Sequence, residues 1–156
     1  MPRKRKAAGT SPPPQELPPA EPELWLSQLA GSPLVQSGHL VSLAPDAPQL
    51  IVAEQGPPMR AEEAATVVEG VRKATLHEDY VSVAGHHYLI TSIQRTSYYG
   101  RDVQTAVESG GEGGGGLLVI RTVTMLVVVT YAFPTLAAEV VPLAELFADK
   151  LIEHSL

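Results

Sequence analysis

The most apolar stretch of the chain, LLVIRTVTMLVVVTYAF at residues 117–133, limits what this sequence can fold into. Its length is close to that of a membrane span, but it contains Arg121 and three threonines, and Pro134 follows it. Valine and threonine favour strands over helices, and a charge inside the run disfavours a membrane span. We therefore predict two buried strands, LLVIRTV and MLVVVTYA, joined by a tight turn, and no membrane span.

A glycine-rich run, ESGGEGGGG at residues 108–116, stands directly before that stretch. A phosphate-binding loop would place its glycines between a strand and a helix, and a P-loop would add a lysine followed by serine or threonine. Here a strand is expected to follow, no lysine is present, and Glu108 and Glu112 would repel a phosphate. We interpret the run as a flexible connection between neighbouring strands, which tolerates changes of length at little cost.

Three helices are predicted from apolar residues at helical spacing. The first covers residues 23–31, where Trp25 and three leucines give an amphipathic face. The second lies in MRAEEAATVVEGVRKATL, residues 59–76, with acidic residues early and basic residues late, as the helix dipole favours. The third covers residues 142–156, with Pro142 in its first turn, where proline is tolerated.

Between these helices the sequence predicts short strands joined as hairpins. A PDAP turn joins the first pair, an Ala84-Gly85 turn joins the second, and a turn around Gly100 leads to a further strand. The order is helix, two strands, helix, several strands and a last helix. It predicts an α+β fold with a single antiparallel sheet flanked by N- and C-terminal helices.

Residues 1–22 contain seven prolines and almost nothing that a core could bury. We expect a disordered, basic and proline-rich tail there, before one folded domain at residues 23–156. The basic head of the tail is typical of a nuclear-localisation signal and equally of a solvated terminus. This head consists of Arg3, Lys4, Arg5 and Lys6. No signal peptide is expected, so we expect the protein in the nucleus, the cytoplasm or both.

Composition narrows the possible functions. The chain has no cysteine, which excludes disulfides, thiolate metal sites and a cysteine nucleophile. Its net charge is −6, but beyond the basic head seven basic and 17 acidic residues give residues 7–156 a charge of −10. So acidic a body repels phosphate backbones, and we expect no direct binding to nucleic acid.

Catalytic patterns are missing from the sequence. There is no GxSxG motif and no triad-like arrangement of serine, histidine and aspartate. His86 and His87 are adjacent, and neighbouring side chains of a strand point to opposite faces, so the two cannot bind one metal ion together. We predict that the protein is not an enzyme and has no catalytic residue, metal site or cofactor.

From Glu23 to Leu156 the order and spacing of the segments resemble the profilin family. Profilins begin with a tryptophan-bearing helix, which ELWLSQLA resembles. VSVAGHHYLITSI is similar to a strand pair of the family, and LFADKLIEHSL resembles its C-terminal helix. The resemblance implies the profilin fold and a protein that binds actin on one face and polyproline between its terminal helices, where aromatic side chains suit a polyproline II ridge.

The resemblance also implies which residues bind a partner. Trp25 falls where the family has the tryptophan of its first helix, and Phe147 falls near an aromatic residue of its last helix. The implied polyproline-binding or partner-binding residues are Trp25, Leu29, Phe147 and Leu151.

Three positions differ from the family pattern. Gln28 replaces a tyrosine that follows the tryptophan by three positions. Leu50 or Ile51 stands where a second-strand tryptophan is expected, and Val140 or Val141 where a histidine of the last helix is expected.

Three functions stay open on this basis. The first is a non-enzymatic adaptor, a profilin-like subunit of a nuclear or cytoplasmic complex that binds through its terminal helices or a strand edge. The second is a cytoskeletal regulator that binds actin or polyproline. The third is a roadblock-like dimeric scaffold, because an antiparallel sheet with flanking helices fits that class too. All three imply a protein partner, whose identity stays open together with the oligomeric state.

Overall fold

The computed structural model describes residues 21–44, 49–104 and 114–156. Its centre is a seven-stranded antiparallel sheet with the order β2-β1-β7-β6-β5-β4-β3. The strands are β1 (Ser37–Ser42), β2 (Ile51–Gln55), β3 (Val81–Val83), β4 (His86–Gln94), β5 (Ser97–Asp102), β6 (Gly116–Arg121) and β7 (Met125–Tyr131). The helical elements of the described residues include α1 (Glu21–Ala30), α2 (Ala61–Arg72), the short 3-10 helix η1 (Leu76–Glu78) and α4 (Ala137–Glu153).

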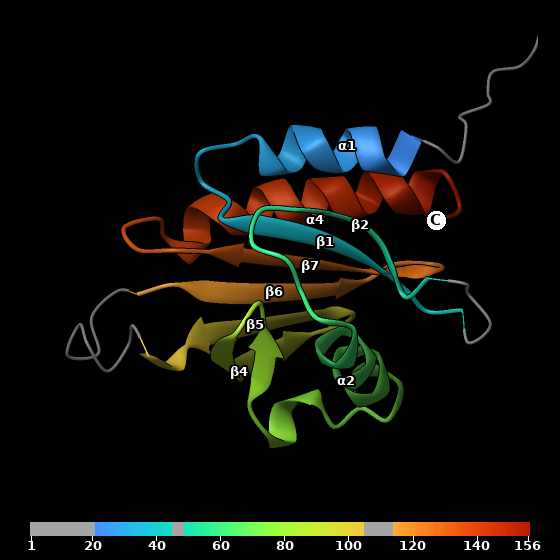
Figure 1. Ribbon diagram of the computed structural model, residues 1–156. Helices are drawn as coiled ribbons and strands as arrows, with labels where there is room; N and C mark the ends of the chain where they lie inside the picture. Colours follow the sequence, from blue (N-terminus) through green and yellow to red (C-terminus); the bar gives the residue numbers. More distant parts are fainter. Residues whose placement is uncertain (1–20, 45–48, 105–113) are drawn as a thin grey trace, which may run out of the picture.

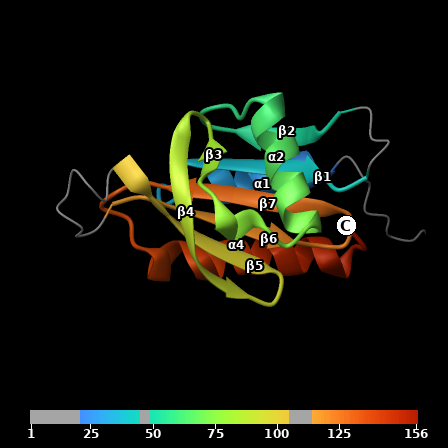
Figure 2. The ribbon, with the colours of Figure 1, turned by 90° about the horizontal axis from the view of Figure 1, so that it is seen from below.

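Helices cover both faces of the sheet. The first and last helices, α1 and α4, lie side by side on one face, and α2 lies on the other (Figure 1). Seen from below, α2 crosses the sheet while α4 lies behind it (Figure 2). This arrangement confirms the predicted α+β fold with terminal helices flanking one antiparallel sheet.

Each face of the sheet has its own apolar core. Alternate residues of β7 enter the two cores, Val127 under the terminal helices and Val128 under α2. Every residue of β7 is buried, as are all residues of β6 except Arg121. Because these central strands are covered on both sides, their sequence is apolar throughout rather than alternating. The prediction of two buried strands in residues 117–133 is confirmed.

No helix in the described part of the chain is long and apolar enough to cross a membrane.

Helix α2 follows its sequence pattern. Its predicted apolar face is buried and consists of Ala64, Val67, Val68 and Val71. Glu63, near the start of the helix, is also buried. Its carboxylate accepts hydrogen bonds from the backbone N–H groups of Arg60 (2.8 Å), Ala84 (3.0 Å) and Gly85 (3.1 Å) and from the hydroxyl of Ser82 (2.8 Å). Glu63 therefore fastens the β3–β4 turn to α2.

The predicted turn around Gly100 is wrong. Gly100 lies inside β5, opposite Ile90 of β4, and the turn between these strands includes Arg95, whose φ is 56°. A Cβ atom on Gly100 would lie 3.0 Å from the carbonyl oxygen of Leu89. Glycine is required here by the close approach of a neighbouring strand and not by a turn.

The expected start of the last helix is also wrong. Helix α4 begins at Ala137, so Pro142 lies inside the helix rather than in its first turn. The Leu136 N–H donates a hydrogen bond of 2.9 Å to the Glu139 carboxylate, which caps the helix start. Val140, in the added turn, is fully buried. The cap and this burial offset the backbone hydrogen bond that Pro142 cannot donate.

The end of the glycine run is fixed by packing. Gly116 begins β6 opposite Tyr131, and a Cβ atom on Gly115 or Gly116 would overlap Tyr131. The rest of the predicted flexible connection, residues 108–113, lies outside the described residues. Two other predictions lie outside them as well, the PDAP turn at 45–48 and the tail up to residue 20.

Candidate protein-binding site

The terminal helices bring together the residues that the sequence predicted for partner binding. Trp25 and Leu29 come from α1, and Phe147 and Leu151 come from α4, and all four belong to one apolar cluster above the sheet. Their exposed fractions are 7% for Trp25, 8% for Leu29, 7% for Phe147 and 0% for Leu151. Leu151 is core, and the other three keep only a small accessible surface.

Trp25 lies where α1 meets the end of α4, and two polar side chains contact its ring, one from the last turn of α4 and one from the residue that caps the helix. The Lys150 Nζ atom lies 4.8 Å from the Trp25 ring centroid, a cation–π contact. The His154 ring lies 4.9 Å from the same ring at an interplanar angle of 51°. The His154 Nδ1–H donates to the Lys150 carbonyl oxygen at 2.9 Å, which holds the imidazole in place. Lys150 and His154 are themselves partly exposed.

Sequence reasoning missed both of these residues. Lys150 and His154 lie three and seven positions after Phe147, so they continue the helical stripe that faces α1. The family pattern has a histidine where Val140 or Val141 stands, but Val140 is buried in the core. The spacing from Phe147 was the signal that could have found them.

A second surface lies between α4 and the β4–β5 hairpin. Glu145 of α4 accepts hydrogen bonds of 2.8 Å from the Ser97 hydroxyl and from the Tyr99 hydroxyl. Burial, followed by the Glu145 carboxylate, raises the pKa of Tyr99. A hollow of ≈ 390 Å³ opens here, and Arg95 and Asp149 also line it. Leu89 of β4, which pairs with Arg101 at the other end of β5 from Ser97, is 42% exposed, so the terminal helices leave that part of the sheet uncovered.

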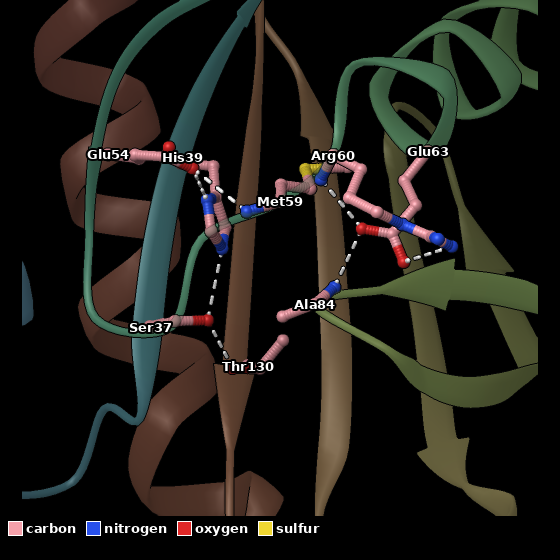
Figure 3. A network of polar contacts seen from close by, with 8 residues as sticks. All are labelled: Ser37, His39, Glu54, Met59, Arg60, Glu63, Ala84 and Thr130. Carbon is pink, nitrogen blue, oxygen red and sulfur yellow. Dashed lines mark hydrogen bonds and ion pairs between the residues drawn. The ribbon is translucent and has the colours of Figure 1, made fainter.

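On the α2 face of the sheet, hydrogen-bonded polar side chains lead from the partly exposed Glu54 into the core (Figure 3). His39 Nδ1 lies 2.9 Å from Glu54 Oε2, and His39 Nε2 lies 3.1 Å from Ser37 Oγ. Because a carboxylate can only accept, Nδ1 carries the proton toward Glu54, and Nε2 accepts from the Ser37 hydroxyl. The Ser37 hydroxyl also bonds with Thr130. Burial lowers the pKa of His39 below its usual 6.5, against the opposing effect of Glu54.

Glu54, His39 and Ser37 follow one another in the acid–histidine–serine order of a hydrolase triad, but the serine is not accessible to a substrate as it is in a triad. Ser37 is 1% exposed and His39 is 0% exposed, so an acyl substrate cannot reach the serine oxygen. Glu54 also accepts the backbone N–H of Met59 at 3.1 Å, which ties the loop before α2 to β2. The arrangement satisfies polar groups within the core and fastens a loop.

Among the described residues, no group of three or more histidine, aspartate or glutamate side chains could hold a metal ion.

The family model for profilin matches residues 23–156, and the chain belongs to the profilin family. Profilins are not enzymes, so the prediction that this protein is not an enzyme is confirmed by its family. Because the chain belongs to the profilin family, the alternative of a roadblock-like dimeric scaffold no longer applies.

Solved structures agree with the family assignment. Schizosaccharomyces pombe profilin is 20% identical, with a TM-score of 0.70 over 86% of this chain and 98% of that chain. Mouse profilin IIa in complex with a double repeat from the FH1 domain of mDia1 is 15% identical, with a TM-score of 0.65 over 85% and 97%. LokiProfilin2 in complex with rabbit actin is 14% identical, with a TM-score of 0.64 over 84% and 95%. No curated protein sequence matches the chain.

Proposed function

We propose that this protein is a non-enzymatic module that binds a proline-rich segment across the junction of α1 and α4. The observation that carries the proposal is the position of Trp25, which lies at this junction beneath two partly exposed side chains. Flat aromatic rings suit the preformed polyproline II helix, which loses little entropy on binding. Mouse profilin IIa, a relative in fold, has been solved with a proline-rich FH1 repeat.

The predicted residues have different parts in this proposal. Trp25 supplies the stacking surface, and Leu29, Phe147 and Leu151 hold it from below within the apolar cluster. Because Trp25 is only 7% exposed, a ligand has to displace the side chains above it. Lys150 is long, flexible and partly exposed, so moving it leaves the helices in place.

The test is a titration of the full chain with a ten-residue polyproline peptide. The chain has one tryptophan, so the fluorescence change has a single origin. We expect a saturable change with polyproline and none with a glycine-serine peptide of equal length. Calorimetry should show that Trp25→Leu abolishes binding, whereas the control Tyr80→Leu, which removes a 57% exposed aromatic residue near α2, retains it. No binding by the native chain, or equal binding by folded Trp25→Leu, contradicts the proposal.

A second candidate function is binding of actin at the surface between α4 and the β4–β5 hairpin. The support is the uncovered sheet face with its hollow beside Glu145, together with a profilin relative solved in complex with actin. Its test is binding of monomeric actin by the full chain and by Tyr99→Lys, which places a long cation where the ring lies. Equal binding by both forms, or none by the native chain, refutes this assignment.

The comparisons favour these ligands over the broader expectation of an adaptor subunit in a nuclear or cytoplasmic complex. The nuclear-localisation role of Arg3, Lys4, Arg5 and Lys6 stays a prediction. The test is a fluorescent fusion in which serine replaces all four residues. If the basic head is an import signal, the replacement lowers the nuclear fraction of the fusion protein, and an unchanged nuclear fraction contradicts the role.

A further inference from the structure

We propose that Lys150 makes the junction of α1 and α4 selective for proline-rich segments of a partner that carry a carboxylate beside their prolines. This inference rests on the proposed proline-binding function and adds the charge of the ligand. Lys150 is the residue that determines the specificity.

The first observation is where the ammonium group lies. The Lys150 Nζ atom sits over the Trp25 ring, 4.8 Å from its centroid, on a surface that a stacking proline needs. His154 contacts the same ring and is anchored to the Lys150 carbonyl oxygen, so it is the less mobile of the two covers. A proline segment therefore gains access to Trp25 by moving the ammonium group.

The second observation is that the ammonium group has no carboxylate partner within the described residues. Asp149 and Glu153 are neighbours of Lys150 in sequence and are exposed, yet neither forms an ion pair with it. At the C-terminal end of α2, by contrast, the capping residue Lys73 pairs with Glu69 at 2.7 Å. The cation at the junction is thus available to a carboxylate from outside.

The third observation is that the two terminal helices contain no basic residue other than Lys150. Lys150 is the only lysine or arginine in the sequences of α1 and α4, within a body whose net charge is −10. An acidic ligand is repelled by most of the molecule and meets a positive charge at the aromatic junction.

These observations together predict that Lys150 exchanges its contact with the Trp25 ring for an ion pair with the ligand. A carboxylate next to the prolines draws Nζ away from the Trp25 ring into an ion pair, and the uncovered ring stacks on a proline. A neutral proline segment displaces the ammonium group without replacing its partner, and a basic segment is repelled by it. The expected order of affinity is acidic, then neutral, then basic.

The experiment compares three peptides, PPPPEPPPP, PPPPQPPPP and PPPPKPPPP, with the full chain by Trp25 fluorescence. The glutamate peptide should bind about two- to five-fold tighter than the glutamine peptide at low salt, the range expected of one solvent-exposed ion pair. The preference should disappear in 1 M NaCl, where charges are screened within about 3 Å. Affinity ratios are compared within one protein variant, so any competition by the chain's own residues 11–20 cancels.

Two variants separate this inference from the proposed function. Lys150→Met keeps an unbranched side chain against Trp25 and should abolish the charge preference, while Lys150→Glu should reverse it. The control Lys73→Glu makes the same charge change at the C-terminal end of α2, away from the junction, and should leave the preference intact. Equal affinity for the three peptides, or a preference that survives Lys150→Met, overturns the inference alone. If no peptide binds, both the proposed proline-binding function and this inference are refuted.

Discussion

Replacing Glu63 by glutamine tests how much one buried carboxylate contributes to this fold. Each Glu63 oxygen accepts two hydrogen bonds, Oε1 from the N–H groups of Arg60 and Ala84, and Oε2 from the Ser82 hydroxyl and the Gly85 N–H. Glutamine keeps one acceptor oxygen and turns an NH₂ group toward two donors. With the NH₂ group at the Oε2 position, the Ser82 hydroxyl can turn to accept from it, but the Gly85 N–H loses its acceptor.

The magnitude follows from that one unsatisfied donor. Leaving a partly buried donor unsatisfied costs about 1–3 kcal/mol, so we expect Glu63→Gln to lower the free energy of unfolding by about 2 kcal/mol. The Arg60 guanidinium, 3.7 Å from the Glu63 carboxylate and 68% exposed, adds little to this.

The assay is urea unfolding at pH 7. The matched control is Glu62→Gln, the same chemical change on the adjacent residue, whose side chain is 79% exposed. The control should stay within about 0.5 kcal/mol of the native chain. A loss below about 1 kcal/mol for Glu63→Gln would refute the assigned role of this carboxylate.

The pH dependence checks the same carboxylate independently. Burial alone would raise the pKa of Glu63, but hydrogen bonds from Arg60, Gly85, Ser82 and Ala84 outweigh it and lower the pKa below 4.5. The unfolded chain therefore binds the proton more readily than the folded one, and stability is lost as pH falls below 4.5. The native chain and Glu63→Gln should converge in stability there; curves that stay parallel would contradict the lowered pKa.

Three further predictions concern other described contacts. His39 has a lowered pKa in the folded state, so stability should fall as pH drops below 6.5, and this slope should be absent from His39→Gln in equilibrium unfolding at several pH values. Gly100→Ala should destabilise the chain by about 1–3 kcal/mol in urea unfolding, because its Cβ meets the Leu89 carbonyl oxygen; an unchanged midpoint would contradict the strand-packing role. The Thr122 hydroxyl donates to the Leu156 carbonyl oxygen at 2.9 Å, so Thr122→Val should cost about 1 kcal/mol, and hydrogen exchange should be faster at the Leu156 N–H, which bonds to Leu151; unchanged exchange there would contradict the anchoring role.

The elements that could be predicted from the sequence are those with strong local patterns. The stretch at residues 117–133 identified β6 and β7 because strands covered on both faces are apolar throughout. The stripe of Val67, Val68 and Val71 identified α2 for the same kind of reason. The order of such elements was enough to suggest the family.

What the sequence did not reveal depends on contacts between distant segments. Gly100 looked like a turn residue because its requirement comes from Leu89 on a neighbouring strand. The start of α4 was placed too late because Pro142 masks a helix whose cap lies at Leu136 and Glu139.

In the candidate site, too, some residues could be predicted from the sequence and others depend on contacts between distant segments. Trp25 and Phe147 could be proposed from the resemblance, but the cover that α4 places over the Trp25 ring follows from the packing of the terminal helices. The hydrogen bonds that link Glu54, His39 and Ser37 join β1 and β2 and have no local signature in the sequence.

The most direct test of the central claim is the NMR signal of the Trp25 indole N–H in the full chain during titration with decaproline. The chain has one tryptophan, so this signal needs no further assignment. The account predicts that it shifts and saturates together with the amides of α1 and the last two turns of α4, while those of α2 stay in place. An unchanged indole signal at saturating peptide, or shifts confined to other parts of the sheet, would contradict proline binding at the junction of the terminal helices.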